Sequence, residues 1–320
     1  MGFVPVVEGV PGVEDVLVRT ARRLRTTTTL VLAPGGGAVD DGRAALLVDP
    51  AWDADELVAV ADETSARGGR LVAGYSTHAH HDHLLWHPRL GPEVPRWATA
   101  PAALVARRER PRLLTEARAD AGRYGGAGHP AEVLDLLGRV APVPAGERGV
   151  PDPDGVLPPT ELVVHDGHAP GHGALWLPRS RVLVAGDVLS DVELPLPLDE
   201  IAGGGTVAST EASTEAGSVA GSVAGSEVSR EASREASREG SAVRDVERYL
   251  AGLDRLAPYA ARCAVVVPGH GTPTADAVAR LDADRRYLDA VLAGHAVDDP
   301  RLVLPGAAEE DRRLRAALAR

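Results

Sequence analysis

The 320-residue sequence predicts an α/β protein built around one large domain. Strand-like apolar segments and helix-like segments follow one another from residue 26 onward, which is typical of layered α/β folds. Histidine-rich polar segments come directly after several of the predicted strands, where ligands usually bind in such folds. A low-complexity repeat interrupts this pattern, and the pattern resumes after it.

The first predicted elements lead directly to the most polar of these segments. Residues 26–33 (TTTTLVLA) and 43–50 (RAALLVDP) are apolar runs that predict two strands, and a glycine-rich turn separates them. Residues 53–69 predict a helix, because apolar residues recur at helical spacing between an aspartate at the start and Gly-Gly at the end. Residues 70–77 then predict a strand that runs into the segment THAHHDH.

The second half of the chain repeats the combination of strands and polar loops. Residues 161–189 predict three strands separated by a loop and a turn, and residues 263–271 predict a strand that ends in PGHG. The remaining predicted elements are a short strand at 96–100, an interrupted helical region at 101–137, an amphipathic helix at 243–260 and a helix after Thr274.

A period-four repeat of small and polar residues occupies most of 202–241, beginning ASTEASTE at residue 208. It has no large apolar residue to bury, so it cannot offset the entropy that ordering would cost. We therefore expect a disordered insertion within one domain. The predicted organisation is an N-terminal segment at 1–24, a domain formed by 25–201 and 242–295, and a C-terminal tail or helix at 296–320.

Composition limits the partners and the compartment. A formal net charge of −12 does not favour a nucleic-acid partner, so we expect a small-molecule substrate instead. Cys263 is the only cysteine and allows no intramolecular disulfide. Neither a signal-peptide pattern nor an apolar run long enough for a membrane span is present, so the expected location is the cytoplasm, without a membrane partner. The oligomeric state is not indicated.

The segment STHAHHDHLL, residues 76–85, contains four histidines and one aspartate within six residues. A core would not accept such a cluster without partners, and imidazole is a good ligand for zinc or iron. His78 and His80 point the same way at a strand end, because side chains i and i+2 share a face. Asp82 and His83 follow around the turn, so the segment predicts two adjacent metal sites.

Four motifs together resemble the metallo-β-lactamase fold hydrolases. THAHHDH resembles the family signature H-x-H-x-D-H, RVLVAGDVL its strand ending in Gly-Asp, VVVPGHG its last ligand loop, and ALLVDP its early strand ending in Asp-Pro. Each motif alone can occur by chance, but here they stand in family order and in strand-to-loop context. The resemblance implies a four-layer αββα sandwich, with two mixed sheets face to face and metals at one sheet edge.

The resemblance also implies a set of side chains for two metal ions bridged by one aspartate. Zinc is expected, two ions per chain, with iron or manganese as alternatives. Asp82 and Asp187 are the candidate catalytic residues, because Asp187 would bridge the metals and Asp82 could orient the shared hydroxide or move a proton. The implied metal ligands are His78, His80, Asp82, His83, His168, Asp187 and His270.

The middle ligand of this set has two candidates, His168 and His172, in the segment DGHAPGHGALWLP. A literal match to the family's P-G-H favours His172. Alignment with G-H-T-P-G-S followed by an apolar strand favours His168, and the 19 residues from His168 to Asp187 (187 − 168) leave room for a loop and two strands. We choose His168 and expect His172 to lie behind the ligands or to face the substrate.

The expected function is metal-dependent hydrolysis of a small molecule. A hydroxide shared by two zinc ions would attack an ester, thioester, lactone or β-lactam, since a bound metal lowers the pKa of water to about 7. Two alternatives stay open. One is an oxidoreductase of the same fold with a single iron, resembling persulfide dioxygenases, and the other is a phosphodiester hydrolase. The fold hosts many chemistries, so it does not choose the substrate.

Overall fold

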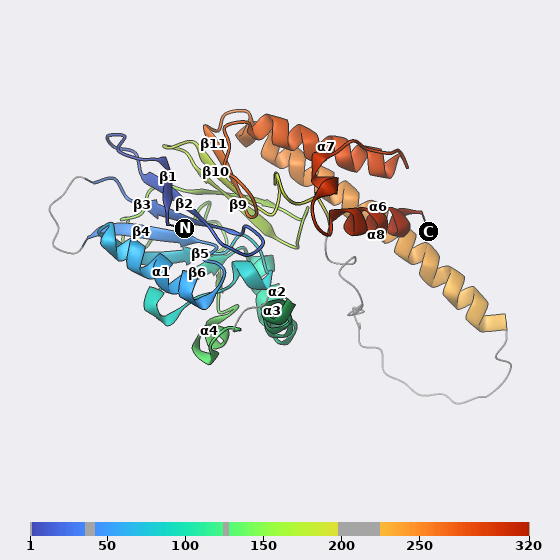
Figure 1. Cartoon of the computed structure of the whole chain (residues 1–320), viewed down its shortest axis with the longest axis horizontal. Coiled ribbons are helices and arrows are strands. Elements are labelled where there is room, and N and C mark those ends of the chain that lie inside the picture. Colours follow the sequence, from blue (N-terminus) through green and yellow to red (C-terminus); the bar gives the residue numbers. More distant parts are fainter. Residues whose placement is uncertain (1, 36–41, 124–127, 198–224, 320) are drawn as a thin grey trace.

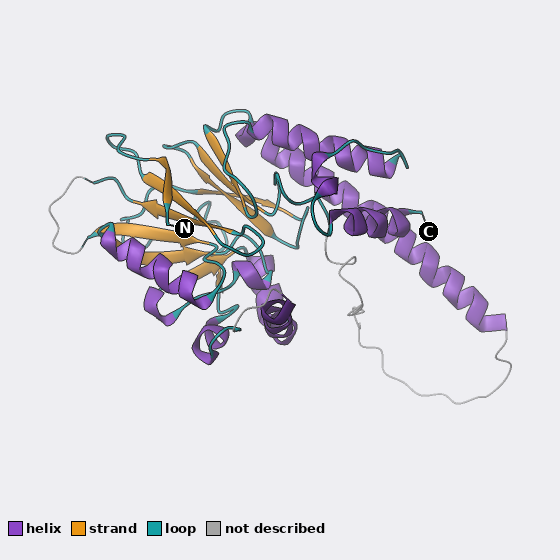
Figure 2. Cartoon of the chain, in the orientation of Figure 1, coloured by secondary structure: helices purple, strands orange, loops and turns teal. Residues whose placement is uncertain are grey.

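The computed structural model describes residues 2–35, 42–123, 128–197 and 225–319. Within these residues, two β-sheets lie face to face and helices cover the outer face of each sheet (Figures 1 and 2). The chain therefore has the four-layer αββα architecture that the sequence predicts.

The larger sheet has seven strands, and their spatial order follows their order in the chain. The first four strands pair antiparallel, whereas the last four pair parallel, so the carboxyl ends of the last four meet at one edge. The strands are β1 (Val4–Val7), β2 (Asp15–Thr20), β3 (Thr27–Leu32), β4 (Arg43–Val48), β5 (Gly69–Tyr75), β6 (Arg96–Ala98) and β7 (Ala141–Pro142).

The N-terminal segment, for which the sequence predicts no strand, contributes β1 and β2 to this sheet. Strand β2 pairs with β3 from Asp15↔Leu32 to Thr20↔Thr27. Both strands lack a long apolar run: β1 has four residues and includes Pro5, and β2 carries Asp15 and Arg19. Their pairing with β3, rather than their own composition, makes them strands.

The smaller sheet has four strands in the order β11-β10-β9-β8. Strands β8, β9 and β10 pair antiparallel, and β11 pairs parallel to β10, so β8, β10 and β11 end at the same edge. These strands match the four that the sequence predicts at 161–189 and 263–271. They are β8 (Glu161–His165), β9 (His172–Leu177), β10 (Val182–Gly186) and β11 (Val265–Pro268).

The helices form the outer layers (Figure 2). Helix α1 packs on the larger sheet, while α6, α7 and α8 pack on the smaller one. Three short 3₁₀ turns, η1 (His81–His83), η2 (Pro88–Leu90) and η3 (Pro300–Val303), lie in the connections. The helices are α1 (Ala54–Ala66), α2 (Ala100–Arg108), α3 (Arg110–Arg123), α4 (Ala131–Leu136), α6 (Gly225–Ala260), α7 (Ala277–Leu292) and α8 (Ala307–Leu318).

The larger sheet contributes side chains to two hydrophobic cores, because successive residues of a strand point to opposite faces. On β2, Val16 and Val18 face the smaller sheet and join a core with Leu175 and Val184 from that sheet. Leu17, between them, points the other way into the core beneath α1. Burying both faces in this way holds the sheets in fixed relation, which any site built from the ends of both sheets requires.

The two sheets are joined directly at one corner. The amide of Thr27 donates to Gly269 O at 2.7 Å, and the amide of Gly271 donates to Arg25 O at 3.0 Å. The start of β3 therefore pairs with the loop that follows β11. This loop carries His270, so the corner also fixes the backbone of one predicted metal ligand.

The long helix α6 begins within the segment that the sequence predicts as an insertion. Residues 202–224 of the expected insertion lie outside the described residues, and 225–241 form the first part of α6. In this part the repeat changes to SREASREASREG, and Ala, Arg and Glu have high helix propensity. The helix expected at 243–260 is the remainder of α6, where Val246, Tyr249 and Leu253 are buried.

The C-terminal segment, expected as a tail or helix, contains η3 and α8. Ala307 and Leu314 of α8 are buried in the same core as α6 and α7. Among the described residues, no helix combines the length and the apolar character that crossing a membrane would need.

Candidate metal centre

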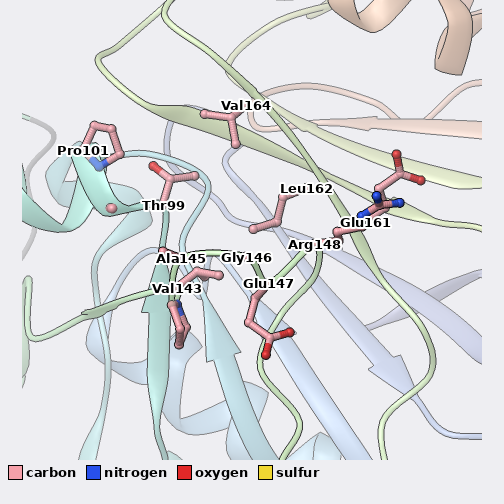
Figure 3. A pocket seen from close by; sticks show the side chains of 12 residues that line it. Thr99, Pro101, Val143, Ala145, Gly146, Glu147, Arg148, Glu161, Leu162 and Val164 are labelled. Carbon is pink, nitrogen blue, oxygen red and sulfur yellow. The ribbon is translucent and has the colours of Figure 1, made fainter.

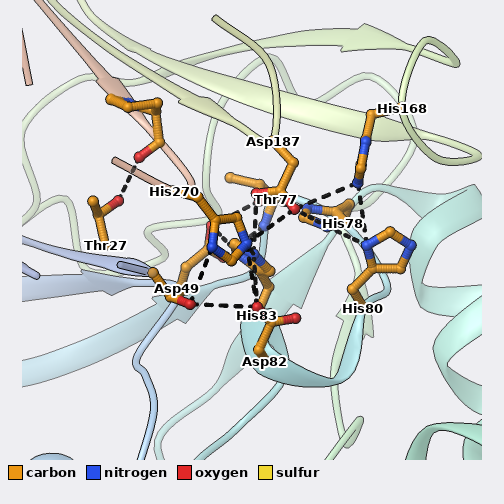
Figure 4. Close-up of polar contacts among 12 residues, drawn as sticks. Thr27, Asp49, Thr77, His78, His80, Asp82, His83, His168, Asp187 and His270 are labelled. Atoms are coloured by element: carbon orange, nitrogen blue, oxygen red, sulfur yellow. Dashed lines mark hydrogen bonds and ion pairs between the residues drawn. The ribbon is translucent and has the colours of Figure 1, made fainter. Parts of the chain in front are cut away.

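The seven side chains that the sequence predicts as ligands come together at one edge of the two sheets (Figure 4). Four of them lie just beyond β5, in the segment that ends with η1. The other three follow β8, β10 and β11, whose ends meet at the same edge of the smaller sheet. A segment of six residues and three loops far apart in the chain thus share one location.

The first group consists of His78, His80, His168 and Asp187. The Nδ1 atom of His80 lies 2.9 Å from His78 Nε2 and 3.2 Å from His168 Nε2. The Oδ2 atom of Asp187 lies 3.3 Å from His78 Nε2 and 3.4 Å from His168 Nε2. Three ring nitrogens and a carboxylate oxygen therefore surround one point.

The second group consists of Asp82, His83 and His270. The Nε2 atoms of the two histidines are 3.2 Å apart, and Asp82 Oδ2 lies 3.5 Å from His83 Nε2 and 3.3 Å from His270 Nε2. Asp187 reaches this group too, with Oδ1 3.1 Å from His83 Nε2 and Oδ2 3.3 Å from His270 Nε2. Asp187 is thus the side chain that both groups share.

His172 lies behind these groups. Its Nε2 atom accepts the backbone N–H of Asp187 at 3.2 Å. Its ring is stacked between those of His165, with centroids 4.5 Å apart, and His78, at 5.0 Å. His168, in contrast, directs Nε2 toward the Asp187 carboxylate itself, at 3.4 Å. The choice of His168 as ligand stays a prediction, and the position of His172 supports it.

Two glycines allow Asp187 to approach its neighbours. A Cβ on Gly269 would lie 1.9 Å from Asp187 Oδ1. Gly186 has φ +65°, and a Cβ there would lie 2.4 Å from His172 Nε2. Any side chain at either position would displace the shared carboxylate or the histidine behind it, so the centre requires both glycines.

Asp49 supports the second group, a role that the sequence does not reveal. Its Oδ2 atom lies 3.0 Å from His83 Nδ1, and its two oxygens accept the N–H of Thr77 at 2.9 Å and the hydroxyl of Thr77 at 2.7 Å. A carboxylate behind an imidazole orients the ring and raises its basicity as a ligand. In the sequence, ALLVDP places Asp49 directly after a buried strand, but only the fold brings its carboxylate next to His83.

Backbone strain gathers around the centre. Among the described non-glycine residues, positive φ occurs at Arg181 and at four residues beside the predicted ligands: Leu24, Arg25, Asp49 and Leu189. Leu24 O accepts His270 Nδ1 at 2.9 Å, and Leu189 lies two residues beyond Asp187. Such conformations cost about 1–3 kcal/mol each and persist where the surroundings enforce them.

The pKa values of the histidines differ between the two groups. Burial lowers the pKa of His78 to about 4 and that of His80 well below its usual value, so both rings are neutral at neutral pH. Burial also acts to lower the pKa of His83, but the carboxylates of Asp187 and Asp82 outweigh it and hold that pKa well above its usual value. The carboxylates of the second group thus favour positive charge there more than burial disfavours it.

The donor set fits metal ions. Imidazole nitrogen and carboxylate oxygen are the ligands that zinc and related metals bind, and all seven side chains offer them at mutual distances within 4.8 Å in each group. Where ring nitrogens face other ring nitrogens, protons alone offer few ways to complete their hydrogen bonds. These His/Asp clusters could therefore bind metal ions.

Two cavities lie near this edge. A cavity of about 250 Å³ opens beside His168 and is also lined by Ala169, Pro170, Pro197 and Arg248. A larger one, of about 440 Å³, lies between the 143–148 loop and β8 and contains none of the predicted ligands (Figure 3). Of these two cavities, the smaller one has a predicted ligand, His168, in its wall.

No protein-family model matches the sequence, and no curated protein matches it. Solved structures do resemble it. A β-lactamase domain protein from Burkholderia ambifaria is 17% identical over 98% of this chain and 85% of its own, with a TM-score of 0.53. A metallo-β-lactamase family protein from Thermus thermophilus is 20% identical over 97% of this chain and 92% of its own, with a TM-score of 0.51.

A third structure, a double mutant of the sec-alkyl sulfatase PisA1, is 17% identical and has a TM-score of 0.54. It is matched over 91% of this chain but only 42% of its own length. At these identities the likeness establishes the fold, and the chain has the metallo-β-lactamase fold.

Proposed function

We propose that this chain, which has the metallo-β-lactamase fold, is a hydrolase that uses two metal ions to cleave a small-molecule carbonyl compound. One observation carries the proposal: the Asp187 carboxylate lies within 3.1–3.4 Å of histidine nitrogens from both groups. A single carboxylate shared by two sets of donors is what a pair of adjacent metal ions requires.

We assign zinc to both positions, the first held by His78, His80 and His168 and the second by Asp82, His83 and His270. When bound, the zinc ions would polarise a substrate oxygen and lower the pKa of water from about 15.7 to about 7. Neutral imidazoles and ionised carboxylates are the forms in which these side chains bind metal, and burial lowers the pKa of His78 and of His80, which keeps these two rings neutral.

The chain's own residues would orient the reaction. His172, by accepting the amide of Asp187, fixes the backbone from which the shared carboxylate projects. Asp82 is buried, its Oδ2 atom lies 3.3 Å from His270 Nε2, and the same oxygen accepts a long hydrogen bond, 3.4 Å, from the hydroxyl of Thr26. We assign Asp82 the task of orienting the attacking water and of holding its proton.

The cavity beside His168 supports a small substrate. Its volume of about 250 Å³ suits a compact molecule, and Ala169, Pro170 and Pro197 provide an apolar wall. An ester, thioester, lactone or β-lactam has a carbonyl carbon that can enter such a space. The net charge of −12 disfavours a nucleic-acid polymer.

The names of two structural neighbours also support hydrolysis. One is named a β-lactamase domain protein and another a sec-alkyl sulfatase. For this chain we favour the carbonyl substrate that the sequence also predicts.

The test combines metal analysis with a substrate panel. Purified protein is analysed for metal content and then assayed with zinc on esters, thioesters, lactones and a β-lactam. We expect two metal ions per chain and turnover of at least one compound. Asp254→Ala serves as the control for Asp187→Ala, because Asp254 is a 68% exposed aspartate paired with Arg285 on the surface.

The proposal fails if the protein holds one tightly bound iron and consumes oxygen in the presence of a thiol or persulfide. That result would establish the oxidoreductase alternative. Turnover that survives in Asp187→Ala at the level of Asp254→Ala would place the chemistry elsewhere in the molecule.

A further inference from the structure

The loop after β10, residues 187–193, carries more of the metal centre than its one predicted ligand. Besides Asp187, it carries Ser190, whose hydroxyl donates to the backbone carbonyl of His270 at 2.7 Å. Leu189 in the same loop has φ +60°, a conformation that a leucine does not hold without support. The position of two predicted ligands thus depends on how this loop is held.

A buried arginine from the C-terminal segment holds the loop. The Nη1 atom of Arg301 donates to Ser190 O at 3.2 Å and to Glu193 O at 3.0 Å. The same atom also donates to the carboxylate of Asp284 on α7. The other oxygen of Asp284 accepts the N–H of Leu189 at 2.9 Å. One guanidinium and one carboxylate therefore bind three backbone groups of the 187–193 loop.

These charges are almost completely withdrawn from solvent. Arg301 is 4% exposed and Asp284 1% exposed, and Asp299 completes the network by accepting from Nε at 3.0 Å and Nη2 at 2.7 Å of Arg301. A buried ion pair contributes little net stability compared with apolar side chains of similar size. The network is therefore better explained by what it positions than by the stability it adds.

If Arg301 served only to hold the C-terminal helices together, its N–H groups would donate to α7 and α8 alone. Arg301 instead gives two of its contacts to carbonyls of the loop that holds Asp187. The planar fork of the guanidinium is what allows one residue to bind Asp299 on one side and the loop on the other.

We infer that Arg301 is a positioning residue of the metal centre and acts through the 187–193 loop. It holds the loop so that Asp187 faces both histidine groups and Ser190 holds the backbone of His270. The inference rests on the proposed metal function, and it makes the segment around η3 a working part of the site although it lies more than 100 residues from Asp187 in sequence.

The experiment compares Arg301→Met with Arg315→Met in the full chain. Arg315 on α8 is also a C-terminal arginine, with Asp311 at 2.9 Å and His295 O at 2.8 Å as partners, and none of its contacts reaches the loop. Zinc affinity is measured by competition with a chromophoric chelator, and amide hydrogen exchange of residues 187–193 is measured in metal-free protein.

We expect Arg301→Met to weaken zinc binding by about 10–100-fold, the usual effect of removing a group that supports a ligand. Exchange of the Leu189 amide should accelerate in this variant, and Arg315→Met should change neither quantity. Arg301→Lys keeps the charge but loses the planar fork of the guanidinium. Its zinc affinity and its Leu189 exchange rate should lie between those of Arg301→Met and the unchanged protein. This variant replaces Arg301→Met in the test if the methionine variant does not fold.

Equal zinc affinity and loop exchange in Arg301→Lys and the unchanged protein would overturn the inference. So would an equal loss of affinity in Arg315→Met, because a general loss of stability would then explain both. If the unchanged protein binds no zinc, the proposed function fails, while hydrogen exchange still reports whether Arg301 holds the loop.

Discussion

The metal centre and the Arg301 network are both buried clusters of charged and titratable side chains, but their contacts differ in kind. In the Arg301 network, a guanidinium donates to the carboxylates of Asp284 and Asp299 and to two carbonyls, so each contact joins a donor to an acceptor. In the metal centre, ring nitrogens face ring nitrogens, as between His83 and His270 at 3.2 Å.

The difference shows how to separate a structural cluster from a binding site. A network whose donors and acceptors match is satisfied by the chain alone. A cluster in which lone pairs converge is satisfied only when something positive enters, whether protons or metal ions. The contacts within the metal centre should therefore respond directly to metal removal and to pH, whereas those within the Arg301 network should not.

Loss of the shared carboxylate should have the largest effect. Asp187→Ala removes the one side chain that contacts both histidine groups, so we expect loss of bound metal and abolition of turnover. Metal stoichiometry and the substrate panel measure it. Asp254→Ala, at an exposed site, should retain both. Full metal occupancy in Asp187→Ala would contradict the assignment.

The second-largest effect should show whether His168 or His172 is the middle ligand. His168→Ala should lose metal from the first group, because it removes a ring nitrogen that faces His80 and Asp187. His172→Ala leaves the group intact but releases the amide of Asp187, so its loss of affinity should be about 10–100-fold. Zinc titration ranks the two variants. The reverse ranking would show that the middle ligand is His172.

Acid should release metal from the centre. The pKa of His83 and that of His270 are held well above the usual value in the metal-free chain, so zinc must displace protons from both rings. Zinc affinity should therefore rise with pH across the neutral range and fall as the medium becomes acidic. Competition titrations at several pH values measure this, and an affinity independent of pH would contradict it.

Metal removal should lower stability by a moderate amount. A ligand at 100 times its dissociation constant stabilises the folded state by about 2.7 kcal/mol, so a strong chelator should lower Tm by several degrees. The chelator should not lower the Tm of Asp187→Ala, because that variant holds no metal. It should lower the Tm of Arg315→Met as much as that of the unchanged protein, since the contacts of Arg315 lie away from the centre. Calorimetry with and without chelator is the measurement.

The smallest effect concerns the repeat. Replacing residues 203–240 with a short Gly-Ser linker should leave Tm and metal content nearly unchanged, because these residues include no large apolar group and long insertions add little closure entropy. The buried residues Ala242, Val246, Tyr249 and Leu253 of α6 follow the replaced segment and are retained. A fall in Tm of many degrees would show that the replaced segment packs against the domain.

Local patterns allowed much of the fold to be predicted from the sequence. Apolar runs such as Arg43–Val48 and Val265–Pro268 marked the strands, and the dense segment at 78–83 marked the candidate metal centre. Residues whose role depends on distant partners could not be predicted in this way. Asp49 and Arg301 act through contacts across the fold, and β1 and β2 are strands because β3 lies beside them.

The corner that joins the two sheets beside His270 has a consequence for biosynthesis. The centre closes only when the start of β3 meets a loop 244 residues later, as the contact between Thr26 and His270 shows. His78 leaves the ribosome 192 residues before His270 (270 − 78), which takes about 10–40 s at about 5–20 residues per second. During that interval the nascent chain exposes part of its histidine set, so any cation captured then is held by an incomplete site and stays exchangeable until β11 arrives.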